Sequence, residues 1–179
     1  STYDGTTVVN GLEVTQFDET STVAFTEGSI TKPLSETGPV TGSLVVAEPL
    51  LACFDGAAST PLDNAADISG NIALIQRGSC AFSQKVSRAL DSGATAVVVY
   101  DNGGGVTVMG GDFVGGIPGG MVTEAVGSML NSSAVEGGNV TVTMSAGTYV
   151  EQEETGNIMA DFSSRGPNAS TLDVIKPDI

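Results

Sequence analysis

The sequence predicts a mixed α/β domain. Residues 72–100 form a strand, a helix and a second strand with short connections, and this βαβ pattern implies parallel pairing of the two strands. A further strand and helix follow over residues 117–135, and a last strand is predicted at residues 140–144. The chain also has 24 glycines and no tryptophan, which favours a chain rich in strands and turns over a helical bundle.

The region before the βαβ unit is predicted to consist of strands and loops. The first forty residues are rich in threonine, serine and glycine, and they contain short β-branched runs such as residues 22–25. Residues 44–47 are the first strand that we expect to belong to the main domain. Pro49 and the Asp55–Gly56 pair then predict a loop.

Within the βαβ unit, two apolar runs flank an amphipathic helix. Residues 72–75 and 96–100 are short and continuously apolar, as buried strands are. Ser79 is the predicted cap of the helix, and Gly93 is placed to end it. One apolar face of this helix follows from the spacing of Phe82, Val86, Ala89 and Leu90.

A second helix and a half-buried strand complete the prediction. After the expected strand at residues 117–122, Thr123 is placed to cap a helix that runs to about Val135. Its inward side chains are predicted to be Val126, Met129 and Leu130. Apolar residues then alternate with threonines, as in a strand with one buried face: Val140, Val142 and Met144.

A glycine-rich segment separates the predicted strands at residues 96–100 and 117–122. Nine of the residues from 101 to 120 are glycine. Such a segment packs few side chains, and glycine loses more conformational entropy on ordering than other residues. We therefore expect a loop that is either functional or disordered.

The charge excludes some classes of partner. The chain has six basic and 21 acidic residues, with a net charge of −15. Such a surface repels phosphate groups, so neither nucleic acid nor an anionic membrane is an expected partner. No apolar stretch approaches the roughly 20 residues of a membrane-spanning helix. The acidic surface is either simply solvated or attracts cationic peptides or Ca²⁺.

Catalytic, metal and cofactor motifs are not found. The chain has no histidine, which excludes Ser-His-Asp and Cys-His arrangements and histidine-dependent zinc motifs. Ser29 and Lys32 match an SxxK pattern, but Pro33 follows and the segment has no helical period. We expect no cofactor and no metal, and we expect this chain not to be an enzyme.

The two cysteines are predicted to pair. Cys53 and Cys80 lie 27 positions apart, and an even number of cysteines in an exported chain indicates a disulfide. Closing such a loop stabilises a chain by about 3.5 kcal/mol on the chain-entropy model. The alternative is a pair of free buried thiols.

The segment NIALIQRGSCAFSQKVSRALDSGATAVVVY, residues 71–100, resembles the core signature of the protease-associated (PA) domain. The resemblance implies a compact β-rich fold, barrel-like or of the swivelling β/β/α type, with two main helices. It also implies a non-catalytic module that is attached to peptidases or sorting receptors, where it covers, gates or recruits.

A second segment, DFSSRGPNASTLDVIKPDI at residues 161–179, resembles the corresponding part of subtilisin-like serine peptidases that carry a PA insertion. The opening STYDGTT also resembles a strand of that family, although Tyr3 and Gly5 depart from its pattern. These matches imply three parts: a flank from the parent peptidase (1–40), the PA domain (41–148) and a second flank with the SSRGP segment (149–179). The chain is then an interior or processed fragment of a secreted serine endopeptidase.

On this resemblance the chain is expected to gate or recruit protein substrates for the parent catalytic domain. Its expected partners are that catalytic domain and protein or peptide substrates. The alternatives are a PA domain of another host, such as a sorting receptor or metallopeptidase, and a structural or adhesive extracellular β-rich domain.

Contact candidates gather around the glycine-rich segment. Arg77 either meets a peptide carboxylate or the parent domain, or ties down a turn carbonyl or an acid while its stem covers the core. The other candidates for peptide or protein contact are Asp101, Asn102, Gly103, Gly104, Gly105, Met109, Gly110, Gly111, Asp112 and Phe113.

Overall fold

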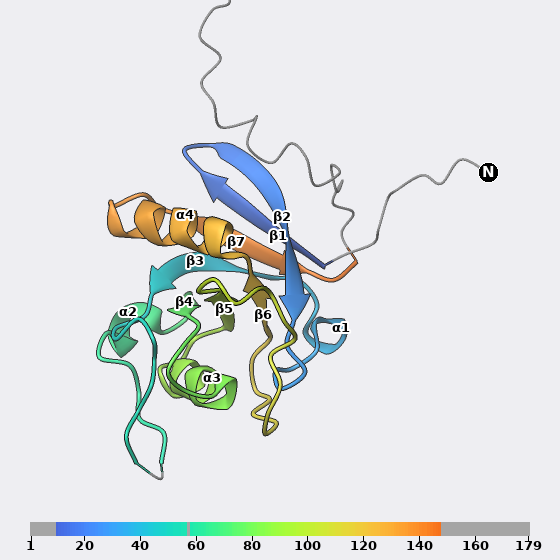
Figure 1. Ribbon diagram of the computed structural model, residues 1–179. Helices are drawn as coiled ribbons and strands as arrows, with labels where there is room; N and C mark the ends of the chain where they lie inside the picture. Colours follow the sequence, from blue (N-terminus) through green and yellow to red (C-terminus); the bar gives the residue numbers. More distant parts are fainter. Residues whose placement is uncertain (1–9, 57, 148–179) are drawn as a thin grey trace, which may run out of the picture.

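The computed structural model describes residues 10–56 and 58–147, and it shows a closed seven-stranded barrel with four helices. Around the barrel the strands follow the order β1-β2-β6-β5-β4-β3-β7 (Figure 1). The mixed α/β, barrel-like fold with two main helices is thus confirmed. In chain order the elements are β1 (Asn10–Gln16), β2 (Glu19–Glu27), α1 (Leu34–Thr37), β3 (Val40–Val46), α2 (Ala65–Ile68), β4 (Ile72–Gln76), α3 (Phe82–Asp91), β5 (Ala96–Tyr100), β6 (Gly119–Val122), α4 (Glu124–Val135) and β7 (Thr141–Ser145).

The predicted βαβ unit forms the centre of the structure. Strand β4 pairs with β5 in parallel, and β5 pairs with β6 in parallel, with Ile72 opposite Ala96 and Val97 opposite Gly119. Every residue of β5 is buried. Strands that are covered on both faces have continuous apolar runs, which explains the sequence AVVVY.

Two apolar clusters cover the two faces of this central sheet. Alternate residues of β5 belong to different clusters: Val98 packs with Leu130 of α4, whereas Val97 and Val99 pack with Val86 of α3. Figure 1 shows α4 and α3 on opposite sides of the strands. The two main helices therefore stabilise the sheet by burying apolar surface on both sides.

The first two strands close the barrel, which differs from the expected N-terminal flank over residues 10–40. Strand β1 pairs with β2 and β7, and β2 pairs with β6. Leu12 and Phe25 are buried in the same cluster as the central sheet. Without these strands, β6 and β7 would each present an unpaired edge, so this part of the chain is integral to the barrel. The opening STYDGTT and the expected flank 149–179 lie outside the described residues.

Both main helices begin and end close to the predicted positions, with two differences. Thr123 caps α4, its side chain accepting a hydrogen bond from the Val126 backbone nitrogen at 3.3 Å, and Gly93 follows α3 with a φ of 80°. The prediction that Ser79 caps α3 is wrong, because the N-cap position is Ala81 and Ser79 has a φ of 60°.

The prediction that Met129 faces inward is also wrong. Met129 is 38% exposed, whereas Gly127 and Leu130 are the buried residues of α4. The helix is rotated so that Gly127 lies directly against the ring-bearing side chain of Tyr100. A Cβ atom at position 127 would overlap the Tyr100 side chain, so the close approach of α4 to β5 requires glycine here.

This contact gives the first prediction. Gly127→Ala should lower the free energy of unfolding by about 1–3 kcal/mol, because the overpacking against Tyr100 outweighs the better helix propensity of alanine. Urea unfolding followed by circular dichroism measures the change. Gly110→Ala is the control, because a Cβ at position 110 meets nothing within 4 Å. A Gly127→Ala protein as stable as the wild type would show that α4 does not pack this closely.

Candidate functional site

Two clusters of polar side chains lie beside the carboxyl end of the central sheet. Arg77 directly follows β4 and Asp101 directly follows β5. Because these strands are parallel, their carboxyl ends meet at one edge, and the Arg77 backbone nitrogen donates to the Tyr100 carbonyl at 2.9 Å. In α/β proteins, binding sites commonly form at the carboxyl ends of parallel strands.

The Asp101 carboxylate organises the start of the glycine-rich segment. Its Oδ1 accepts a hydrogen bond from Arg77 Nη1 at 2.9 Å. Its Oδ2 accepts from the backbone nitrogens of Gly103 at 3.0 Å and Gly105 at 2.7 Å. An aspartate that binds backbone N–H groups shortly after itself forms an Asx-type turn, so Asp101 fixes the direction in which the segment leaves the sheet.

These contacts outweigh the effect of burial on Asp101. Burial raises the pKa of the carboxyl group, whereas hydrogen bonds from the backbone of Gly105, from the Arg77 side chain and from the backbone of Asn102 and Gly103 lower it. The net direction is a lowered pKa. The carboxylate is therefore charged at neutral pH, as an acceptor of several N–H groups should be.

Arg77 ties down an acid and a turn carbonyl, which is the second of the two roles considered from the sequence. Besides Asp101, its Nη1 donates to the Gly105 carbonyl at 2.8 Å, and its guanidinium lies 5.9 Å from the centre of the Phe82 ring. The side chain is half-buried. Arg77 thus positions the segment rather than standing free to meet a partner.

The glycine-rich segment is also anchored at its middle. Met109 is fully buried in the cluster that contains α3, and its carbonyl accepts hydrogen bonds at 3.1 Å from both the backbone nitrogen and the hydroxyl of Ser29. The expectation that this segment packs few side chains is therefore wrong at Met109. A methionine fills an irregular core gap well, because its chain is flexible and unbranched.

Between Asp101 and Met109, and beyond Met109, the segment exposes apolar side chains to solvent. Phe113 is 70% exposed, and Val106 and Val108 are exposed as well. Gly110, Gly111 and Asp112 lie among them and are exposed. The result is a loop with fixed attachment points at Asp101 and Met109 and an exposed apolar surface between them and beyond.

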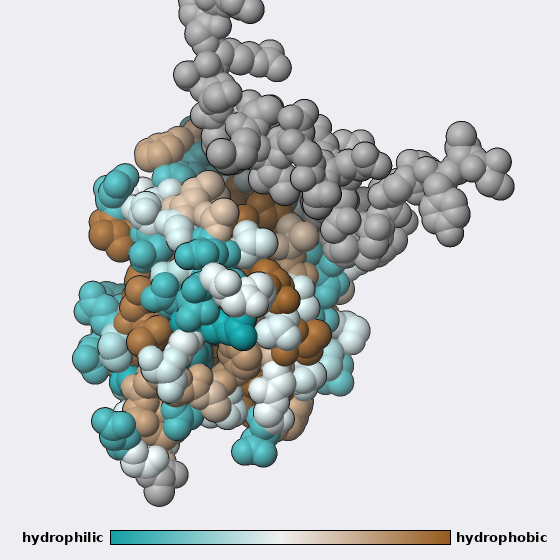
Figure 2. Space-filling view, viewed as in Figure 1, coloured by the Kyte–Doolittle hydropathy of each residue, from teal (hydrophilic) through white to brown (hydrophobic). Residues whose placement is uncertain are grey.

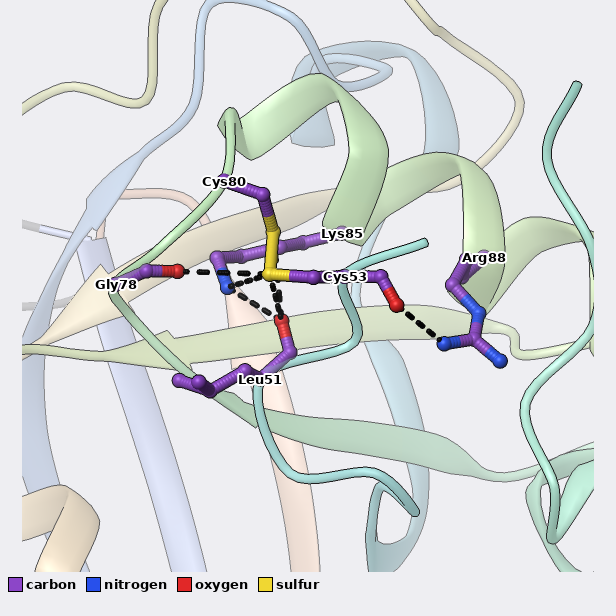
Figure 3. Close-up of a disulfide and its surroundings, with 6 residues drawn as sticks. All are labelled: Leu51, Cys53, Gly78, Cys80, Lys85 and Arg88. Atoms are coloured by element: carbon purple, nitrogen blue, oxygen red, sulfur yellow. Dashed lines mark hydrogen bonds between the residues drawn. A yellow bond between two sulfur atoms is a disulfide. The ribbon is translucent and has the colours of Figure 1, made fainter. Parts of the chain in front are cut away.

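The second cluster surrounds a disulfide. Cys53 and Cys80 are joined, with 2.03 Å between the sulfur atoms and 5.7 Å between the Cα atoms. The bond connects the loop that follows β3 to the segment that precedes α3 (Figure 3). It therefore fixes that loop against the start of the helix.

Lys85 is buried beside this disulfide. The side chain is fully buried, its Nζ donates a hydrogen bond to the Leu51 carbonyl, and it lies 4.0 Å from the Cys53 sulfur. Figure 3 shows the amine nitrogen beside both that carbonyl and the sulfur, with a contact to each. Burial lowers the pKa of Lys85 to about 8, because a charged amine loses its hydration in this position.

Arg88 lies one turn further along α3, and its side chain binds backbone carbonyls of the loop that follows β3. Its guanidinium donates to the carbonyls of Cys53 at 2.8 Å, Thr60 at 3.0 Å and Pro61 at 2.8 Å. The exposed Asp63 lies 3.7 Å away and adds an ion pair at the rim. Lys85 and Arg88 thus satisfy loop carbonyls that the loop does not satisfy within itself, and this role indicates structure rather than catalysis.

The sequence reasoning missed Lys85, Arg88 and the Ser29–Met109 contact. A usable signal was present for Lys85, because it lies three residues after Phe82 and one before Val86 on the predicted apolar face. The described residues contain no group of three histidine, cysteine, aspartate or glutamate side chains that could hold a metal ion. No helix among them is long and apolar enough to cross a membrane.

The sequence also matches a known family, because residues 40–130 match the PA domain over half of the chain. The chain belongs to the PA domain family. The PA domain is a protease-associated module and is not itself catalytic. The family match covers β3 to α4, and the barrel strands β1, β2 and β7 lie on either side of it.

The chain is similar to parts of proteins of different kinds. This chain is 34% identical over 111 residues to the minor extracellular protease Vpr of Bacillus subtilis, and the match covers 60% of this chain and 12% of Vpr. It is 37% identical over 76 residues to a receptor homology region, transmembrane domain- and RING domain-containing protein of Arabidopsis thaliana, covering 42% of this chain and 23% of that protein. The chain therefore spans only a small part of these relatives.

A solved structure supports the fold. The chain is similar to an aminopeptidase from Aneurinibacillus sp. strain AM-1, with a TM-score of 0.57, 26% identity, and coverage of 82% of this chain and 32% of that one. An extracellular protease, a RING domain-containing protein and an aminopeptidase thus contain similar regions, and the module alone does not identify the host.

The disulfide leads to a second prediction. Replacing both Cys53 and Cys80 by serine should lower the free energy of unfolding by about 2–4 kcal/mol, because the unfolded chain regains the entropy that the cross-link removes. Denaturant unfolding measures the loss, and intact mass before and after alkylation counts the thiols. A reductant should destabilise the wild type but leave the double variant unchanged. Two thiols that label in the folded, unreduced protein would contradict the pairing.

Lys85 leads to a third prediction, on pH. Its pKa is about 8 in the folded protein and 10.5 in the unfolded chain. Between pH 8 and pH 10.5 the unfolded chain therefore binds more protons at this position than the folded protein does. The free energy of unfolding should therefore rise from pH 8 to pH 10, by up to about 1.4 kcal/mol per pH unit. Urea unfolding at four pH values measures the slope.

Lys85→Met should flatten this rise, because the variant has no proton to lose at position 85. Lys32→Met is the matched control, since Lys32 is only partly buried and should leave the slope unchanged. Identical slopes for the wild type and Lys85→Met would show that Lys85 is not buried as an amine.

Proposed function

We propose that this chain is the PA module of a secreted subtilisin-like serine endopeptidase, and that its glycine-rich loop meets protein substrates on their way to the catalytic domain. The similarity to the extracellular protease Vpr supports this host, as does the FSSRGP segment at residues 162–167. The module supplies no catalytic residue in this proposal. It contributes a surface.

The observation that carries the proposal is the exposed apolar side of the loop. Phe113 and Val108 are more than half exposed, although the loop is attached to the sheet at Asp101 and to the core at Met109. An exposed aromatic residue on an anchored loop is a typical contact point for a partner, because little entropy is lost when it binds. The contact candidates of the loop divide accordingly, with Asp101 and Met109 as anchors and Gly110, Gly111, Asp112 and Phe113 at the surface.

In this proposal a large substrate meets the loop before it reaches the catalytic domain, and a small one does not. A folded protein has to approach the module as a whole, whereas a short peptide reaches a catalytic cleft without touching the surroundings. The loop should therefore affect the specificity constant kcat/KM for proteins and leave that for short peptides nearly unchanged.

A fourth prediction tests this in the full-length peptidase. Phe113→Ser together with Val108→Ser should change kcat/KM on casein by at least about threefold, and that on a chromogenic tripeptide by less than about twofold, or roughly 0.4 kcal/mol. Phe17→Ser is the matched control, because Phe17 is 82% exposed but lies on the β1–β2 turn. Equal changes on both substrates, or none on either, would contradict a substrate-contacting loop.

A metallo-aminopeptidase host is the second candidate, favoured by the similarity to the Aneurinibacillus aminopeptidase. Inhibitors distinguish the two hosts. A serine-directed sulfonyl fluoride should abolish cleavage of internal peptide bonds by the parent protein, and a chelator of zinc should not. Release of single N-terminal residues that only the chelator stops would identify the second host instead.

A further inference from the structure

A groove opens where strands β3 and β7 separate. Strand β3 pairs with β7 over Val40 to Ser43, and the Leu44 backbone nitrogen makes a last hydrogen bond to the Val140 carbonyl at 2.8 Å. The chain that leads into β7 then diverges from β3, and Gly138 donates to the Ser133 carbonyl at the end of α4. From Leu44 onward, β3 continues toward Glu48 with β4 on its other side.

Two backbone groups of β3 face this groove without a partner. Backbone groups alternate along a strand, and the Ala47 nitrogen donates to Leu74 of β4 at 2.9 Å, so the groups of Leu44 and Val46 point to the groove side. Among the described residues, no donor reaches the Leu44 carbonyl and no acceptor reaches the Val46 nitrogen. Unpaired groups of this kind form a template for another strand.

The next two groups along the same edge are already satisfied by a side chain. Asn64 Nδ2 donates to the Val46 carbonyl at 2.8 Å, and Asn64 Oδ1 accepts from the Glu48 nitrogen at 3.0 Å. The carboxamide thus copies the pair of hydrogen bonds that a neighbouring strand would make. Val140 and Asn64 bracket the open position from both ends.

The groove beside this edge is large enough for an extended segment. Its volume is about 440 Å³, and its walls combine polar groups with apolar side chains, the latter from Leu44, Val45, Val46, Ala134, Val135 and Val140. Val135 is 69% exposed at the mouth. The elements that line it, the ends of α4 and β3, lie at the left of Figure 1, and Figure 2 shows brown next to teal surface on that side of the molecule.

The charge of the groove selects among extended segments. Glu48 is exposed on its wall, and neither lysine nor arginine is among the residues that line it. The chain as a whole has a net charge of −15. A segment that brings a basic side chain close to Glu48 is attracted, and an acidic segment is repelled.

We propose that this groove binds an extended polypeptide segment with arginine or lysine beside alternating apolar residues, which adds to the edge of β3 through the Leu44 carbonyl and the Val46 N–H. Strand addition of this kind takes its affinity from main-chain hydrogen bonds and its specificity from alternate side chains. The surface is separate from the glycine-rich loop, and the proposal does not depend on the host protease.

The test uses the ¹⁵N-labelled chain and a blocked heptapeptide in which valine and threonine alternate and the last residue is arginine. Titration by NMR should shift the amide signals of Val45, Val46 and Asn139, while those of Gly110 and Phe113 stay in place. Versions of the peptide N-methylated at successive residues should then show one sensitive position, because the edge offers one free carbonyl, that of Leu44. Methylation at the paired N–H should weaken binding by at least about fivefold, and methylation at its neighbours should have little effect.

Protein variants test the charge and the wall separately. Glu48→Gln should weaken binding about two- to fivefold and reduce its salt dependence, whereas Glu36→Gln, exposed on helix α1 at the other side of the molecule in Figure 1, should not. Val135→Ser removes apolar surface without adding charge and should weaken binding as well, with Phe113→Ser as its control, because Phe113 is equally exposed but does not line the groove. Because both sites are exposed, these variants should fold.

Several outcomes would overturn the proposal. Shifts confined to the glycine-rich loop would place binding elsewhere, and no shift at millimolar peptide would show that the edge takes no segment. An acidic peptide that binds as well as the basic one would remove the selection by charge. Shifts at the groove that grow with protein concentration alone would identify a second copy of this chain as the occupant.

Discussion

The parallel pairing of β4 and β5 is the constraint on which the rest of the structure depends. It brings Arg77 and Asp101 to one edge, and their ion pair of 2.9 Å fixes the start of the glycine-rich loop. It also leaves two apolar faces to cover, which α3 and α4 do from opposite sides. Helix α3 in turn carries Lys85 and Arg88, which hold the loop after β3. One strand pair thus positions both polar clusters.

Much of this arrangement could be predicted from the sequence where the signal is local. Continuous apolar runs identified β4 and β5, and Thr123 and Gly93 marked helix ends, because these features depend on neighbours along the chain. The even number of cysteines in a chain expected to be exported likewise indicated their pairing. The prediction that Ser79 caps α3 was wrong, because this serine lies in the turn before the helix with a φ of 60°.

Features that depend on distant parts of the chain were less accessible. Closure of the barrel joins Asn10–Gln16 to Thr141–Ser145, and no local pattern reveals that contact. Met109 is held by Ser29, which lies 80 residues away along the chain, and it packs in the same cluster as Ile30. The rotation of α4 depends on the absence of a side chain at Gly127, which a count of apolar positions does not weigh.

The meeting of β1 and β7 has a consequence for how such a module joins a host. Gly11 lies opposite Ser145, and the Gly147 nitrogen donates to Asn10 Oδ1 at 3.3 Å, so the chain enters and leaves the barrel at neighbouring points. A domain whose two ends lie close together can be inserted at a single surface turn of another protein without separating the residues on either side of that turn. In the order of the barrel strands, β5 is separated from this meeting point by two strands on either side, so the edge that carries Asp101 lies on the side of the ring away from both ends.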